Sequence, residues 1–252
     1  MTQALEVRGV SKRFGSVEVL QEVSLTVGEG EFVSLVGPSG SGKSTLFQLI
    51  GGLSNLDAGE IRVDGKSAAG KRGLIAYMPQ QAALLPWRTV AANVELALEI
   101  AGVGRAEARA LSREWLVRVG LGGYADAYPH VLSGGMQQRV SFIRALLSPQ
   151  KLMCLDEPFG ALDALTRMQM QEWLLKLWEA NRRAVLLVTH SIEEALLLSD
   201  RVLVLSDKPA RVLRNIEVPF ARPREEKLWR TPEFNRLKDE IYELLKPASL
   251  VP

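Results

Sequence analysis

A glycine-rich segment carries the residue types that phosphate binding requires. Its residues, which fit the pattern G-x-x-x-x-G-K-[ST], are Gly37, Pro38, Ser39, Gly40, Ser41, Gly42, Lys43, Ser44 and Thr45. Glycines let backbone N–H groups curl around phosphate oxygens, Lys43 supplies a cation for the β- and γ-phosphates, and the Ser44 hydroxyl can ligate Mg²⁺. The pattern predicts a nucleotide site, and the alternative is a chance glycine-rich turn.

Two acidic residues end an apolar segment and could act on the same nucleotide. Residues 152–155 predict a buried strand, and Asp156, Glu157 and Pro158 follow it. In phosphate-loop enzymes the first acid at such a strand end holds Mg²⁺, usually through water. Neighbouring strand residues point to opposite faces, so Glu157 needs a turn, favoured by Pro158, to polarise the attacking water as a general base. The alternative is a pair of solvated acids.

A second helix N-terminus could also bind an anion. Ser133 is a good N-cap, and Gly134 and Gly135 leave the backbone N–H groups behind it uncovered. One nucleotide needs only one such cradle. The alternative interpretation is a plain capped helix.

His190 follows an apolar strand and precedes a helix start. Residues 191–194 read Ser-Ile-Glu-Glu and fit a capping box. The carboxyl ends of strands are where α/β sheets bind ligands, so His190 is a candidate site residue, and the alternative is a histidine of the cap. His130 is given no role, and Cys154 is expected to be a buried, inert thiol.

The elements that must position these residues follow an α/β pattern. Continuously apolar segments predict strands of a parallel sheet covered on both faces: 32–36, 152–155, 184–188, 202–205 and, more weakly, 74–78. Alternating segments near the N-terminus predict an antiparallel layer beside this core: 5–8, 19–27 and 61–63. The fold class is therefore α/β.

We expect a single domain over residues 1–252. The β layer and the core take 1–85 and 149–218, a helical lobe takes 86–148, and a C-terminal tail helix lies within 219–252. Thr231 and Pro232 predict the start of the tail helix. Its expected apolar face is Phe234, Leu237, Ile241, Leu244 and Leu245.

Composition narrows the function classes. The 252 residues have a net charge of +2, so nucleic acid is not expected as the main partner. A single cysteine excludes an intrachain disulfide, and no apolar stretch approaches the ~20 residues of a membrane helix. Any crossing of a membrane is thus expected from another chain.

The chain resembles the ATP-binding subunits of ABC transporters, whose phosphate-loop NTPase fold has a RecA-like parallel core. The family's landmarks occur in order: the phosphate loop at 37–45, the glutamine loop at Gln80, the signature motif at 132–136, the Walker B acids at 156–157, the D-loop at 161–163 and the switch histidine at His190. Two positions depart from the family's pattern. Met136 stands where glutamine is most frequent, and Phe14 stands at the place of an adenine-stacking aromatic that is often tyrosine.

The resemblance implies a homodimer with two ATP molecules in its interface. Ser133, Gly134 and Gly135 of one subunit would cover the γ-phosphate held by Lys43 of the other. Phe14 would stack on adenine, the alternative there being a core phenylalanine. Gln80 would reach Mg²⁺ or the water, and His190 would contact the γ-phosphate. ATP and Mg²⁺ are the implied cofactors.

The chain looks most like the nitrate, sulfonate and taurine importers, which implies a small organic or inorganic anion as cargo. Integral membrane permease subunits would be its partners at the cytoplasmic face of the membrane, and an extracytoplasmic solute-binding protein would act indirectly. Residues 84–87 are expected to line an open groove for a permease helix or to be buried in the lobe. The alternatives are an importer ATPase for another small solute, a non-transport ABC-type ATPase, and a regulatory ATP-binding module.

Overall fold

The computed structural model describes residues 2–246, so residue 1 and the last part of the expected tail region, 247–252, lie outside it. The strands are β1 (Gln3–Phe14), β2 (Val17–Gly28), β3 (Phe32–Val36), β4 (Ala58–Val63), β5 (Lys66–Ser67), β6 (Ala76–Met78), β7 (Leu152–Asp156), β8 (Ala184–Val188), β9 (Arg201–Leu205) and β10 (Val212–Glu217). The α-helices are α1 (Lys43–Ile50), α2 (Val90–Ile100), α3 (Arg105–Arg118), α4 (Gly134–Leu146), α5 (Ala164–Asn181), α6 (Ile192–Leu198) and α7 (Pro232–Leu245). Short 3₁₀ turns cover η1 (Gly122–Tyr124), η2 (Pro129–Val131) and η3 (Glu226–Arg230).

A sheet in the order β10-β9-β3-β8-β7-β6 forms the core. The pairs of β3 with β8 and β9, and of β7 with β6 and β8, are parallel, and every residue of β3, β7 and β8 is buried, as their apolar sequences predict. The weak fifth strand was predicted too long, because residues 74–75 precede the pairing of β6. The antiparallel edge strand β10 was not predicted.

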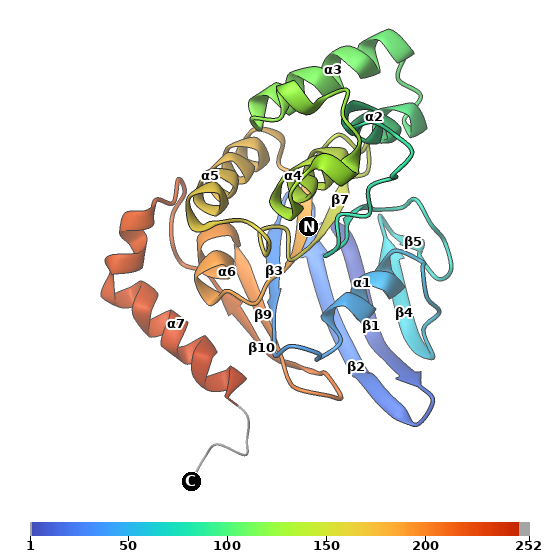
Figure 1. The fold of residues 1–252 in the computed structure, drawn as a ribbon. Coiled ribbons are helices and arrows are strands. Elements are labelled where there is room, and N and C mark those ends of the chain that lie inside the picture. The colour runs from blue at the N-terminus through green and yellow to red at the C-terminus, as the bar shows by residue number, and fades with distance from the viewer. Residues whose placement is uncertain (1, 247–252) are drawn as a thin grey trace.

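The N-terminal segments form an antiparallel sheet in the order β2-β1-β4-β5. Strand β2 matches the predicted segment 19–27 closely, whereas β1 extends well beyond the predicted segment 5–8. Helix α1 packs between this sheet and the parallel sheet (Figure 1), and Phe47 and Ile50 of α1 are fully buried there. The phosphate loop before α1 is thereby fixed between two sheets.

Helices cover the opposite face of the core sheet. Helices α2, α3 and α4 gather at one end of the molecule, and α5 and α6 follow beside them (Figure 1). Phe142 of α4, Leu174 of α5 and Leu155 of β7 belong to one buried cluster, which fixes the start of α4 relative to the core. Cys154 is fully buried, and burial raises the pKa of its thiol, as expected for an inert residue.

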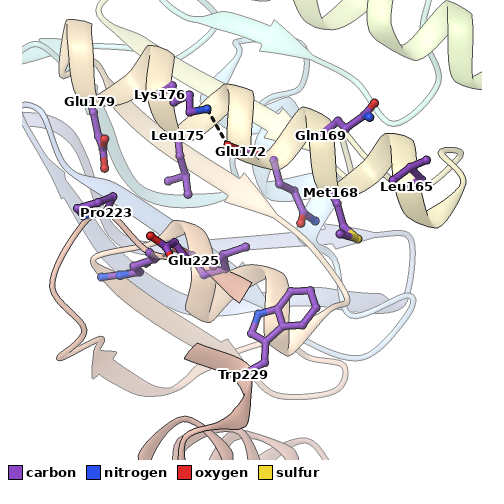
Figure 2. Close-up of a pocket in the computed structure, with 13 residues that line it drawn as sticks. Leu165, Met168, Gln169, Glu172, Leu175, Lys176, Glu179, Pro223, Glu225 and Trp229 are labelled. Atoms are coloured by element: carbon purple, nitrogen blue, oxygen red, sulfur yellow. Dashed lines mark hydrogen bonds and ion pairs between the residues drawn. The ribbon is translucent and has the colours of Figure 1, made fainter. Parts of the chain in front are cut away.

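The tail helix α7 starts where its sequence predicts. The Thr231 hydroxyl accepts a hydrogen bond from the Phe234 amide at 3.3 Å, and Phe234, Leu237 and Ile241 are buried against α6 and the edge of the core. The chain before α7 leaves a pocket of about 470 Å³ beside α5. Met168 and Leu175 point from α5 toward the segment that carries Glu225 and Trp229 (Figure 2). None of the predicted site residues lines this pocket. Within residues 2–246 we find no helix with the length and apolarity to cross a bilayer.

Candidate nucleotide site

The phosphate loop has a backbone conformation that requires glycine. Gly42 has a φ of +109°, and a Cβ there would lie 2.7 Å from Cγ1 of Val19 on β2. Gly40 has a φ of +79°, and the Ser41 amide donates to the Pro38 carbonyl at 3.2 Å. The loop opens into a pocket of about 410 Å³, whose lining includes Phe14, Ser39, Gly40, Gly42, Lys43, Ser44, Thr45, Gln80 and Glu157. The lining does not include Gly37, Pro38 and Ser41. The carbonyls of Gly37 and Pro38 accept hydrogen bonds from Lys43, and Ser41 is buried.

The side chain of Lys43 is hydrogen-bonded to the phosphate loop. Its ammonium donates to the Gly37 carbonyl at 2.9 Å and to the Pro38 carbonyl at 2.8 Å. An ammonium has three donors, so one remains for a phosphate oxygen. Burial lowers the pKa of Lys43, and the nearby carboxylates of Glu157 and Asp156 oppose that shift. The charged form of Lys43 is thus favoured by the two acids at the end of β7.

Asp156 at the end of β7 is a buried carboxylate beside the loop. Burial raises the pKa of Asp156, whereas the Ser44 hydroxyl and the Lys43 charge act in the opposite direction. Its Oδ1 has no hydrogen-bond partner among the described residues. A buried carboxylate oxygen without a partner, next to a serine hydroxyl, fits the hard oxygen ligands that Mg²⁺ prefers.

Glu157 turns out of the strand direction at its own backbone. Its φ of +47° is left-handed, a conformation that costs a non-glycine residue about 1–3 kcal/mol, and its amide donates to the Val188 carbonyl at 2.9 Å. The sequence predicted a turn here, supported by Pro158, and the left-handed residue of that turn is Glu157 itself. The side chain of Glu157 consequently lines the nucleotide pocket, while Asp156 stays below it.

Gln80 and His190 meet at the carboxylate of Glu157. The Gln80 side-chain amide donates to Glu157 Oε2 at 3.0 Å, and His190 Nδ1 lies 3.6 Å from the same oxygen. The side chain of His190 is 62% exposed, whereas that of Glu157 is 21% exposed. A histidine satisfied within a cap would not present its ring to this carboxylate.

The backbone of His190 is fixed by the residues on either side of it. The Ser191 hydroxyl accepts from the Glu194 amide at 3.1 Å, which is the predicted half of the capping box. The Glu194 carboxylate does not return to Ser191 but accepts from the Thr189 hydroxyl at 2.6 Å. The Ser191 amide donates to that hydroxyl at 3.1 Å, so Thr189 takes the place of the missing half.

The second predicted anion site opens into a different pocket. Ser133 caps α4 by accepting from the Met136 amide at 3.3 Å. Ser133, Gly134 and Gly135 line a pocket of about 330 Å³ together with the loop 161–163. Within the described chain, this pocket shares no lining residue with the phosphate-loop pocket. One copy therefore does not bring its two anion-binding segments together.

Phe14 lies at the surface at the end of β1. Its side chain is 50% exposed and lines the phosphate-loop pocket, so it is not a core phenylalanine. The ammonium of Lys12 lies 5.3 Å from the centre of the Phe14 ring. An exposed aromatic ring beside the phosphate loop suits a purine base.

Two lining residues were missed by the sequence analysis, Val19 and Lys208. The fit of Val19 against Gly42 depends on the placement of β2. Lys208 follows β9, and the only signal for it was its position after the carboxyl end of a core strand, the edge where α/β sheets bind ligands.

The comparisons with known proteins agree with this geometry. A family model described as "ABC transporter" matches residues 20–160, more than half of the chain. The chain belongs to the ABC transporter family. Its phosphate-loop NTPase fold is that of the family's ATP-binding cassettes, and the chain is an ATPase that serves transport.

Relatives of similar length include three import ATP-binding proteins. The formylaminopyrimidine import protein of Halalkalibacterium halodurans is 44% identical, with 93% of each chain covered. The taurine import protein of Rhizobium johnstonii is 43% identical over 92% of this chain and 91% of its own. The nitrate import protein of a Synechocystis species is 41% identical over 94% of this chain and 91% of its own.

Solved structures of an ABC transporter cassette are similar as well. A dimeric cassette has a TM-score of 0.79 and 33% identity, and the match covers 86% of this chain and all of the other. A second structure of that cassette, in a post-hydrolysis state with ADP and phosphate, has a TM-score of 0.78.

Proposed function

We propose that two copies of this cassette pack head to tail around two ATP molecules and power import through a separate membrane permease. The observation that carries the proposal is the separation of the two anion-binding segments. Lys43 and Ser133 open into different pockets of one copy, so a second copy must supply Ser133, Gly134 and Gly135 to the γ-phosphate. This arrangement gives an isologous dimer with two equivalent sites.

The residues around the γ-phosphate have separate roles in hydrolysis. Water attacks the γ-phosphorus as the bond to the ADP oxygen breaks, and Glu157 accepts the proton of that water. Gln80 and His190 contact the Oε2 of Glu157 and thereby hold the base in position. Lys43 and the phosphate-loop amides stabilise the charge on the transferred phosphoryl group. Phe14 stacks on the base of the nucleotide.

Ser44, Gln80 and Asp156 are the residues that would hold Mg²⁺. Among residues 2–246 no cluster of three or more His, Cys, Asp or Glu side chains could hold a metal ion alone. That suits a magnesium ion that shares its ligands between protein and phosphate oxygens. The ion would neutralise charge on the β- and γ-phosphates. Asp156, with an unpartnered buried oxygen, is the strongest of the three ligands.

The permease would dock on the loop that follows Gln80. Leu84 is half-buried against the helical lobe, whereas the Trp87 side chain is 72% exposed. Complete burial, one of the two expectations, does not describe this loop. A large aromatic presented to solvent next to a half-buried leucine is typical of a protein contact, and the transmembrane partner would hold this cassette at the cytoplasmic face of the membrane.

The cargo that we propose is a small anion such as a sulfonate, taurine or nitrate, delivered by an extracytoplasmic solute-binding protein. Relatives at 43% and 41% identity are named for taurine and nitrate import. A relative at 44% is named for formylaminopyrimidine import, which keeps another small solute as the alternative. Measuring the uptake of taurine, nitrate and formylaminopyrimidine in cells with and without the gene decides between these cargoes.

Nucleic acid is not a partner in the proposed function, since the net charge of the chain is only +2.

Mixed dimers test the head-to-tail arrangement. Lys43→Ala removes the phosphate cation, and Gly134→Asp places a carboxylate against the phosphate; a Cβ at Gly134 meets nothing within 4 Å, so the fold accepts this change. Each variant alone should lose ATP hydrolysis. Half of the dimers in an equal mixture are mixed and keep one intact site, so about a quarter of the wild-type rate should return.

The mixture also shows how the proposal would fail. Two inactive variants that stay inactive together, while sizing shows that they do form mixed dimers, would exclude sites shared between copies. A Gly134→Asp variant that hydrolyses ATP normally as an isolated monomer would exclude them as well. Pull-down of ribosomes or DNA in place of a polytopic membrane protein would favour the non-transport ATPase.

A further inference from the structure

A lysine outside the family's landmarks lies in the nucleotide pocket. Lys208 belongs to the loop 206–211 between β9 and β10. It lines the phosphate-loop pocket, whose lining also includes Phe14, Val19, Gln80 and Glu157. Lys43 is the other lysine in that lining. Nothing in the roles described above accounts for a second cation at this place.

The loop that carries Lys208 is fixed by its own hydrogen bonds. The Ser206 hydroxyl accepts from the Arg211 amide at 2.9 Å, and the Ser206 amide donates to the Arg211 carbonyl at 2.9 Å. The Asp207 carboxylate accepts from the Lys208 amide at 2.8 Å. These bonds close the loop at its base, so the backbone of Lys208 has a defined position.

The same loop is tied to the strand that supports the phosphate loop. The Ala210 amide donates to the Val19 carbonyl at 2.9 Å, and the Gln21 amide donates to the Ala210 carbonyl at 3.0 Å. Val19 is also the residue that leaves no room for a Cβ at Gly42. Lys208 and the phosphate loop therefore share one support, β2, and keep their relative placement.

The ammonium of Lys208 is available for a ligand. None of the ion pairs formed by the described side chains involves Lys208, and the residue is exposed. Lys12, the other lysine near the Phe14 ring, is engaged by Asp57 at 2.8 Å. Two of the three donors of Lys43 are used by the loop carbonyls. Of these three lysines, Lys208 is the one whose ammonium has no partner in the described part of the chain.

We propose that Lys208 is a second cationic ligand of the nucleotide and contacts its triphosphate. The proposal rests on the nucleotide site proposed above. A triphosphate exposes more oxygens than one lysine and the loop amides neutralise, and a flexible ammonium on a fixed loop can reach them. The alternative is that Lys208 is a solvated surface lysine at the edge of the pocket and does not contact the nucleotide.

Direct binding measurements test this contact. We would titrate ATP and Mg²⁺ by calorimetry against the Glu157→Gln protein, which serves as a non-hydrolysing background, with Lys208→Gln, Lys208→Arg or Lys176→Gln added. Lys208→Gln should weaken ATP binding about threefold to tenfold at low salt and less at high salt, because exposed charge contacts are screened. Lys208→Arg keeps the charge and should restore most of the affinity.

The control removes the same charge elsewhere. Lys176 lies on α5, exposed and paired with Glu172, and its replacement should leave ATP affinity unchanged. Equal affinities of the Lys208→Gln and Lys176→Gln proteins would overturn the proposal, as would a loss that does not depend on salt. A background protein that binds no ATP at all would instead refute the nucleotide site, so the two failures can be told apart.

Discussion

The side-chain amide of Gln80 donates to Oε2 of Glu157 at 3.0 Å, although the two residues are 77 positions apart. Gln80 follows β6 and Glu157 follows β7, which are parallel neighbours, so both side chains emerge at the same edge of the sheet. His190 approaches the same oxygen from the end of β8. A neutral amide holds the carboxylate without neutralising it, which leaves Glu157 able to take a proton.

Replacing Glu157 by Gln should separate ATP binding from hydrolysis. The change keeps the shape of the side chain and removes its basicity, so the hydrolysis rate should fall by about 10²–10⁴ while ATP still binds. The closed dimer should then accumulate, and size-exclusion chromatography with ATP and Mg²⁺ reports it. Glu172→Gln on the exposed face of α5 is the control. A protein that elutes only as a monomer under these conditions would contradict the prediction.

Replacing Phe14 by Ala should weaken nucleotide binding without destabilising the fold. The side chain is 50% exposed, so its truncation leaves no buried cavity. The loss of a stacking face should lower ATP affinity about tenfold, and Phe14→Tyr should retain the wild-type affinity. Fluorescence titration measures the affinity, and thermal melting checks stability. An unchanged affinity for the Ala variant would show that the base binds elsewhere.

Replacing Trp87 by Ala should affect assembly and not the isolated ATPase. Trp87 is 72% exposed, and it lies outside the lining of the nucleotide pocket. Tryptophan is enriched among interface hot spots, whose truncation costs about 2 kcal/mol or more of binding energy, so co-purification with the permease should fall. Tyr242→Ala, an exposed aromatic on α7, is the matched control. Normal co-purification of the Trp87 variant would exclude this loop as the docking surface.

Much of the fold could be predicted because the decisive signals are local. The continuously apolar segments 32–36, 152–155 and 184–188 each became a buried parallel strand, and the phosphate loop lies between β3 and α1 as its pattern requires. The order of the strands could not be predicted in this way, because most neighbouring strands of the core sheet are distant in the sequence.

Other features depend on contacts between distant segments. Lys208 enters the pocket because Ala210 pairs with the strand around Leu20, a pairing that only the folded chain creates. The turn at Glu157 was predicted, but the hydrogen bond of its amide to the Val188 carbonyl joins segments that are distant in the sequence, so its left-handed form was not. Similarly, the capping pattern at Ser191 did not show that the Glu194 carboxylate would accept a hydrogen bond from Thr189 instead of from Ser191.

Glu194 has a buried carboxylate and contacts the residues on either side of His190. The side chain accepts from Thr189 at 2.6 Å, and its Oε1 has no partner among the described residues. Burial raises the pKa of Glu194 to about 7; the Thr189 hydrogen bond and the Arg167 charge oppose this shift, and the Glu157 charge adds to it. The folded protein thus binds a proton on Glu194 more tightly than the unfolded chain does.

Stability should therefore fall as the pH rises through this pKa. The contribution of a protonated Glu194 is complete below the unfolded pKa of 4.5 and is lost as the pH passes about 7, at a cost of up to about 3 kcal/mol. Glu194→Gln is always neutral, so its unfolding free energy relative to wild type should increase between pH 5 and pH 8. Urea denaturation across that range measures the difference, with Glu172→Gln as the control. A difference that stays constant with pH would mean that Glu194 is ionised in the folded protein throughout, and that the Arg167 charge outweighs the burial.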